Sequence, residues 1–96
     1  MSIEKSGSSL MPETITSLIE KLEAGKRSNE LDVQIECALF TADDEYESCR
    51  PNNAGTKVIY TLTNGSHHTC WARDWSMERH RGDTITRLRA QSEARV

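Results

Sequence analysis

The sequence predicts an α+β fold: an N-terminal antiparallel helical hairpin packed on an antiparallel β-hairpin or small sheet, closed by a C-terminal helix. Helical spacing of apolar residues near both ends predicts the helices, and a β-rich stretch interrupted by Asn64-Gly65 predicts the hairpin. The 96 residues suffice for one domain with a small core. We therefore expect residues 11–96 to form a single domain. Residues 1–10, which contain Ser6, Gly7, Ser8 and Ser9, should be a flexible tail.

The helical hairpin is predicted from two apolar stripes. Pro12 suits the first position of a helix over residues 12–24, and Gly25 suits the residue that follows it. The stripe of this helix consists of Ile15, Leu18, Ile19 and Leu22. Ser28 is the expected N-cap of the second helix, whose stripe consists of Leu31, Ile35, Ala38 and Leu39. The short connection makes the two helices antiparallel neighbours.

The β-hairpin is predicted around Asn64-Gly65, with residues 57–63 as its first strand and a further short strand at residues 46–49. A two-residue turn would put the pairs Leu62–His67, Tyr60–Thr69 and Val58–Trp71 on the core face. Trp71 and Trp75 are expected in the core, and the alternative is that Trp75 is an exposed binding anchor. The opposite, half-apolar face would carry Ile59, Thr61, His68, Cys70 and Ala72, which predicts weak homodimerisation.

A last helix is predicted over residues 84–94, with Asp83 as its N-cap and Ile85 and Leu88 as its core residues. Charge is divided unevenly along the chain, because residues 1–50 carry a net charge of −6 and residues 51–96 one of +3. The acidic excess peaks at Asp43, Asp44, Glu45 and Glu47, which form either a solvated loop or a charged recognition surface. The basic excess is mostly arginine near the C-terminus.

Several classes of function lack sequence support. No stretch of apolar residues is long enough to span a membrane, and residues 1–10 do not resemble a signal peptide. The odd count of Cys37, Cys49 and Cys70 favours reduced thiols in a cytoplasm. No nucleotide-binding glycine motif or serine-hydrolase motif is present. We expect no cofactor.

Four residues of metal-binding type, His67, His68, Cys70 and His80, do not make a convincing site. His67 and His68 are adjacent on a strand and therefore point to opposite faces, so only His68 can share a side with Cys70. Two residues apart on one strand, the side chains of His68 and Cys70 lie about 7 Å apart, too far for a nucleophile–base hydrogen bond. We therefore expect neither a metal site nor a catalytic constellation.

Residues 15–39, which read ITSLIEKLEAGKRSNELDVQIECAL, resemble the N-terminal part of the phage ABA-sandwich domain family. Members of that family open with a pattern like LIxxLExAxxxSRELDxxIAxAL. The matching positions are Leu18-Ile19, Leu22-Glu23-Ala24, Ser28 and Glu30-Leu31-Asp32. The family closes with an alanine-rich helix, where this chain has an arginine-rich one. The resemblance implies a phage or prophage accessory protein acting in a bacterial cytoplasm, and it carries over no catalytic residue.

These observations predict a small non-enzymatic protein that binds a host protein, for example to inhibit a bacterial defence system such as a CRISPR effector. The defence target follows from the resemblance and not from the residues. The expected partner-binding residues are Asp43, Asp44, Glu45, Glu47 and Trp75. The alternative is a small nucleic-acid or nucleotide-binding module that uses Arg79, Arg81, Arg87 and Arg89.

Overall fold

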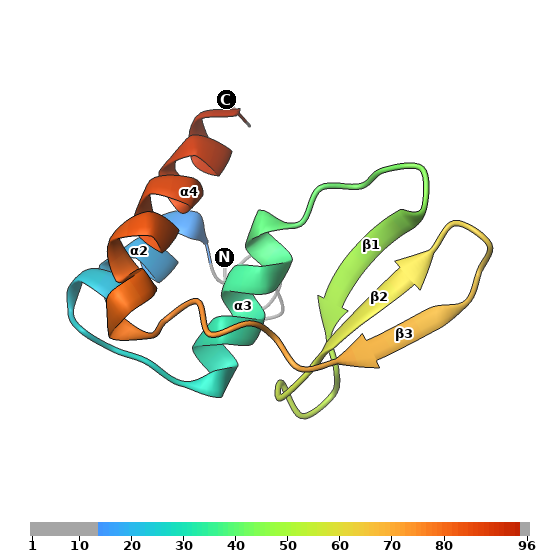
Figure 1. Cartoon of the computed structure of the whole chain (residues 1–96), viewed down its shortest axis with the longest axis horizontal. Coiled ribbons are helices and arrows are strands. Elements are labelled where there is room, and N and C mark those ends of the chain that lie inside the picture. Colours follow the sequence, from blue (N-terminus) through green and yellow to red (C-terminus); the bar gives the residue numbers. More distant parts are fainter. Residues whose placement is uncertain (1–13, 95–96) are drawn as a thin grey trace, which may run out of the picture.

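The computed structural model describes residues 14–94, so the tail expected at residues 1–10 lies outside the described residues. The fold is α+β, as predicted. Its elements in chain order are α2 (Ile15–Glu23), α3 (Asn29–Leu39), β1 (Tyr46–Pro51), β2 (Val58–Leu62), β3 (His67–Cys70), the 3-10 turn η1 (Glu78–His80) and α4 (Arg81–Ala94). The three helices pack together, and of these α3 lies next to a three-stranded antiparallel sheet of order β1-β2-β3 (Figure 1).

The helical hairpin is confirmed, with a different start. Thr14 is the N-cap of α2, and its side chain accepts a hydrogen bond from the backbone N–H of Ser17. Helix α2 therefore begins at Ile15 and not at residue 12, because the hydroxyl of Thr14 caps it there, and Pro12 itself lies outside the described residues. Ser28 caps α3 as predicted, and its Oγ accepts from the N–H of Leu31 at 3.0 Å.

The hydrophobic core lies between the three helices. Leu18 and Leu22 from α2, Ile35 from α3 and Leu88 from α4 are fully buried, with Ile15 and Leu31 beside them. Trp75 and Ile85 are partly buried at its edge. Among the described residues, α4 packs against α2 and α3 and not against the sheet. Within residues 14–94, α3 is therefore the helix that packs against the sheet.

The predicted pairing of the hairpin is wrong by one residue. Tyr60 pairs with His68, Val58 with Cys70 and Thr61 with His67. The N–H of Leu62 donates to the carbonyl of Ser66, and the N–H of Gly65 donates to the carbonyl of Leu62. These bonds close a three-residue loop over residues 63–65, with Gly65 at a φ of +92°, instead of a two-residue turn.

This change of register moves every side chain of β3 to the other face. His68 and Cys70 share the core face with Tyr60, contrary to prediction, and the outer face instead pairs Ile59 with Thr69 and with Arg50. Because Cys70 leaves the outer face and an arginine joins it, the argument for a homodimer through an apolar outer face no longer holds.

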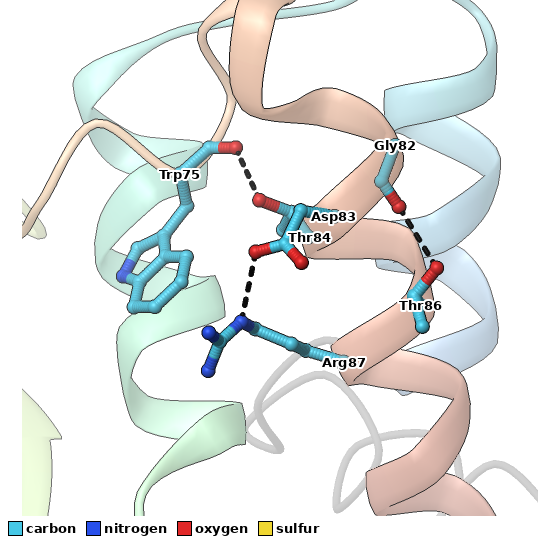
Figure 2. Close-up of polar contacts among 6 residues, drawn as sticks. All are labelled: Trp75, Gly82, Asp83, Thr84, Thr86 and Arg87. Carbon is cyan, nitrogen blue, oxygen red and sulfur yellow. Dashed lines mark hydrogen bonds and ion pairs between the residues drawn. The ribbon is translucent and has the colours of Figure 1, made fainter.

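The start of α4 also differs from prediction. Asp83 is not its N-cap, because η1 runs directly into a helix that already begins at Arg81. Asp83 lies in the first turn and pairs with Arg87 one turn later at 2.9 Å (Figure 2). No helix in the described part of the chain is long and apolar enough to cross a membrane.

Candidate functional site: an aromatic cleft

All five aromatic residues of the chain line a single open cleft of about 790 Å³. We call it the aromatic cleft, and its rings are those of Phe40, Tyr46, Tyr60, Trp71 and Trp75. It lies between the C-terminal half of α3, the core face of the sheet, and α4. Its charged and polar lining includes Glu36, Asp43, His68, Cys70, Arg73, Arg87 and Gln91.

Three rings pack together at one end of the cleft. Tyr60 lies in the middle of β2, where its ring centroid is 6.0 Å from that of Phe40 at the end of α3. It is 5.6 Å from the centroid of Tyr46, in an edge-to-face arrangement. A β-bulge between Tyr46 and Ser48 shifts the register of β1 and leaves Tyr46 opposite Leu62, on the face that carries Tyr60.

The carboxylate of Glu36 organises the cleft. It accepts hydrogen bonds from the hydroxyl of Tyr60 and from the indole Nε1 of Trp75, both at 2.5 Å. One side chain of α3 therefore holds a ring of β2 and a ring of the segment after β3. Burial, together with the hydrogen bond to the Glu36 carboxylate, raises the pKa of Tyr60 above its ordinary value, so the phenol remains the donor.

Two further contacts fix the segment that carries Trp75. The hydroxyl of Thr84, which is fully buried in α4, donates to the Trp75 carbonyl at 2.9 Å (Figure 2). The N–H of the buried Ser76 donates to the carboxylate of Asp32 at 2.7 Å. Asp32 is only 8% exposed, and this burial raises its pKa although both hydrogen bonds from Ser76 act in the opposite direction. Trp75 is therefore held by both α3 and α4.

Trp71 was expected in the core, but its side chain is 65% exposed. The shifted register of β3 explains this, because Val58 now pairs with Cys70 and Trp71 follows the end of the strand. The ammonium of Lys57 lies 4.7 Å from the Trp71 ring centroid, a cation–π contact. Trp75 is half-buried, between the two predicted alternatives, and the Arg73 guanidinium lies 6.0 Å from its ring centroid.

The acidic loop, Asp43, Asp44, Glu45 and Glu47, is exposed and borders the cleft. Asp43 lines the cleft itself, and its Oδ1 accepts from the N–H groups of Glu45 and Tyr46. These two bonds lower its pKa. The backbone of the loop is also tied to the hairpin, because Thr63 bonds to the carbonyls of Asp44 and Glu45. Asp43 is therefore partly structural, Asp44 and Glu45 project from an anchored loop, and Glu47 projects from the start of β1.

The four predicted nucleic-acid-binding arginines do not form one surface. Only Arg87 lines the cleft, with its guanidinium directed toward the side of α4 where the Trp75 ring lies (Figure 2). Arg89 pairs with Glu23 of α2 at 2.9 Å, and Arg79 is exposed on η1. Arg81 is half-buried, and its Nε has no hydrogen-bond partner among the described residues. The arginine of the cleft that the sequence analysis missed is Arg73.

The candidate metal ligands are dispersed in the same way. His68 and Cys70 line the cleft, His67 faces outward beside Thr61, and His80 lies on η1. Within residues 14–94, no group of three or more histidine, cysteine or acidic side chains is placed to hold a metal ion. All three cysteines are free thiols.

Sequence reasoning missed Glu36, Phe40, Tyr46 and Tyr60 as site residues. Nothing near Glu36 in the sequence marks it as a site residue, because its role depends on two donors, Tyr60 and Trp75, far along the chain. The signal available in the sequence was only that aromatic residues are scarce, five in 96 residues. Searches with this chain matched no family model, no curated protein and no solved structure.

Proposed function

We propose that this protein is a small non-enzymatic binding protein that captures a partner protein in the aromatic cleft. The observation that carries the proposal is the gathering of every aromatic residue of the chain around one open cleft. Tryptophan, tyrosine and arginine are the residues most enriched at binding hot spots, and the cleft contains two of each. The 65% exposure of Trp71 supplies a large apolar anchor that nothing in the fold requires.

The cleft suits a protein partner because its charges are mixed and partly satisfied. Glu36 is engaged by Tyr60 and Trp75, and Arg87 is engaged by Asp83. Such a surface resembles the core of a protein interface, where aromatic rings and arginines replace lysines and carboxylates. The rings are held before any partner arrives, which lowers the ordering cost of binding.

The acidic loop at the rim gives the partner a charge preference. Asp44 and Glu45, whose backbone is tied to Thr63, and Glu47 at the start of β1 are exposed, so they would attract a basic partner surface and accelerate its association. The resemblance to phage proteins supports a more specific form of the proposal. In that form the partner belongs to a bacterial defence system, such as a CRISPR effector, and its basic nucleic-acid track meets the acidic loop.

The test is quantitative binding to the partner recovered from a phage-susceptible bacterium. Trp71→Ala should weaken binding by about thirtyfold or more, as expected for a hot-spot anchor worth about 2 kcal/mol. Lys57→Ala is the matched control, because it removes the stacked cation and leaves the ring. Equal affinity of Trp71→Ala and wild type would refute the cleft as the binding surface.

A second variant tests the acidic loop separately. Replacing Asp44 by asparagine and Glu45 and Glu47 by glutamine leaves Asp43 to support the loop. This triple variant should keep the melting temperature and slow association at low salt, and the difference from wild type should shrink as salt is added. An unchanged association rate at low salt would remove the loop from the proposal.

A nucleotide or single-stranded nucleic acid is the second candidate ligand, favoured by Arg73 and Arg87 beside the tryptophan rings. Base stacking on Trp71 would quench its fluorescence, and phosphate contacts would make the affinity fall steeply with salt. Titration with a short oligonucleotide at two salt concentrations distinguishes the candidates. Salt-sensitive quenching that Arg73→Ala abolishes would favour nucleic acid over a protein partner.

A further inference from the structure

Two cysteines from different elements face each other between α3 and β1. Cys37 lies in α3 and Cys49 in β1, and their sulfur atoms are 3.5 Å apart. Both residues are half-buried and therefore not sealed from solvent. Helix α3 and strand β1 are packed neighbours, as Figure 1 shows, so the sulfur contact lies where the helical layer meets the sheet.

The third cysteine is excluded from this pair by the sheet. Cys49 is on β1 and Cys70 is on β3, with β2 between them. Two strand spacings amount to about 9–10 Å, whereas the Cα atoms of a disulfide are at most about 7 Å apart. A Cys49–Cys70 bridge would therefore require the sheet to open, and the fold selects Cys37 as the partner of Cys49.

We propose that Cys37 and Cys49 form a redox site that a low-molecular-weight disulfide oxidises to an intramolecular disulfide bond. In the net reaction the two thiols and one disulfide RSSR give the Cys37–Cys49 bond and two molecules of the thiol RSH. The protein loses two electrons and two protons, and the small disulfide gains them. A thiol in excess reverses the reaction.

The order of attack follows from the sulfur contact. A hydrogen bond from Cys49 lowers the pKa of Cys37, which makes Cys37 the better thiolate. Its sulfur attacks RSSR, forms a mixed disulfide and releases the first thiol. The contact with Cys37 raises the pKa of Cys49 in the reduced protein. Formation of the mixed disulfide consumes the Cys37 thiolate and so removes this cause of the raised pKa. Cys49 then loses its proton, attacks the sulfur of Cys37 and releases the second thiol.

The bridge would act on the walls of the aromatic cleft. Glu36, which holds Tyr60 and Trp75, precedes Cys37 in α3, and Tyr60 pairs with Cys49 across the β1–β2 ladder. A covalent bond between Cys37 and Cys49 therefore fixes α3 against the strands at the point where Glu36 binds Tyr60. This inference goes beyond the proposed function and does not depend on it.

The experiment uses the full chain incubated with oxidised glutathione, then quenched with an alkylating reagent and digested with trypsin and a glutamate-specific protease. Cleavage after Glu36, Glu45, Glu47, Lys57 and Arg73 separates the three cysteines into the fragments 37–45, 48–57 and 58–73. We expect fragments 37–45 and 48–57 to become joined and fragment 58–73 to retain an alkylated Cys70 or a glutathione adduct. A thiol reductant added before alkylation should separate them.

Three variants and one denatured sample make the test specific. Cys70→Ser should form the bridge as wild type does, and Cys49→Ser should stop at a glutathione adduct on Cys37. Cys37→Ser, which removes the contact that raises the pKa of Cys49, should stop at a glutathione adduct on Cys49. The bridge should form at least about tenfold faster in folded protein than in urea, because the fold holds the two sulfurs together. Two results with folded protein would overturn the proposal. In one, no joined fragments appear; in the other, fragment 58–73 is found in a disulfide with another fragment as often as fragments 37–45 and 48–57 are found joined to each other.

Discussion

Replacing Glu36 by alanine is expected to loosen the cleft and the contact between the helices and the sheet together. The substitution removes the acceptor of the Tyr60 hydroxyl and of the Trp75 indole N–H. Hydrogen bonds to charged groups contribute about 1.5–3 kcal/mol each, and at this half-buried site water can replace part of that. We therefore expect the free energy of unfolding to fall by about 3 kcal/mol, which corresponds to a drop in melting temperature of roughly 12–24 °C in a domain of this size.

Urea unfolding followed by circular dichroism measures this loss. Glu36→Gln retains an acceptor for the indole and should cost about half as much. Glu20→Ala, which removes an exposed carboxylate from α2, is the control and should stay within about 0.5 kcal/mol of wild type.

A tyrosine titration gives a second readout that a general loss of stability would not produce. In a Tyr46→Phe background, Tyr60 is the only tyrosine, and its ionisation can be followed by ultraviolet absorbance. Burial and the Glu36 carboxylate hold its pKa above the ordinary value, and Glu36→Gln should bring that pKa down. If the titration is the same with glutamate and glutamine, and Glu36→Ala unfolds like wild type, the role assigned to Glu36 is wrong.

The remaining predictions concern stability. Leu22→Ala should lower the free energy of unfolding by about 2–5 kcal/mol in urea, since the side chain is fully buried, and a loss below about 1 kcal/mol would contradict the helical core. Asp32 has a raised pKa, so native protein keeps a proton that unfolded protein loses above pH 3.8. The free energy of unfolding should therefore fall as pH rises from 3.8, the ordinary pKa of the side chain, through the higher pKa of Asp32 in the folded protein. Asp32→Asn should remove this decrease. Gly65→Ala should cost about 1 kcal/mol or more at its φ of +92°, whereas Gly82→Ala in α4 should stabilise by about 0.5–1 kcal/mol. Equal melting temperatures for the two alanine variants would refute the loop geometry.

Local signals determined the helical part of this protein. The stripe of Leu18 and Leu22, the stripe of Leu31 and Ile35, and the cap at Ser28 all depend on residues within a few positions of one another. Helical periodicity and capping are local interactions, so the sequence alone was sufficient to predict α2 and α3. The existence of three strands and a hairpin at Asn64-Gly65 was likewise visible in the sequence.

The tertiary structure decided which side chains of the sheet face α3, and therefore which of them line the aromatic cleft. Thr63 bonds to the carbonyls of Asp44 and Glu45, 19 and 18 residues away in the chain, and belongs to the loop and not to β2. A three-residue loop forms in place of a two-residue turn, and the resulting shift of one residue turns Cys70 toward the cleft and leaves Trp71 exposed. Because side chains alternate along a strand, this shift reversed every face assignment in β3, and Asn64-Gly65 is compatible both with a two-residue turn and with a three-residue loop that ends in a left-handed glycine.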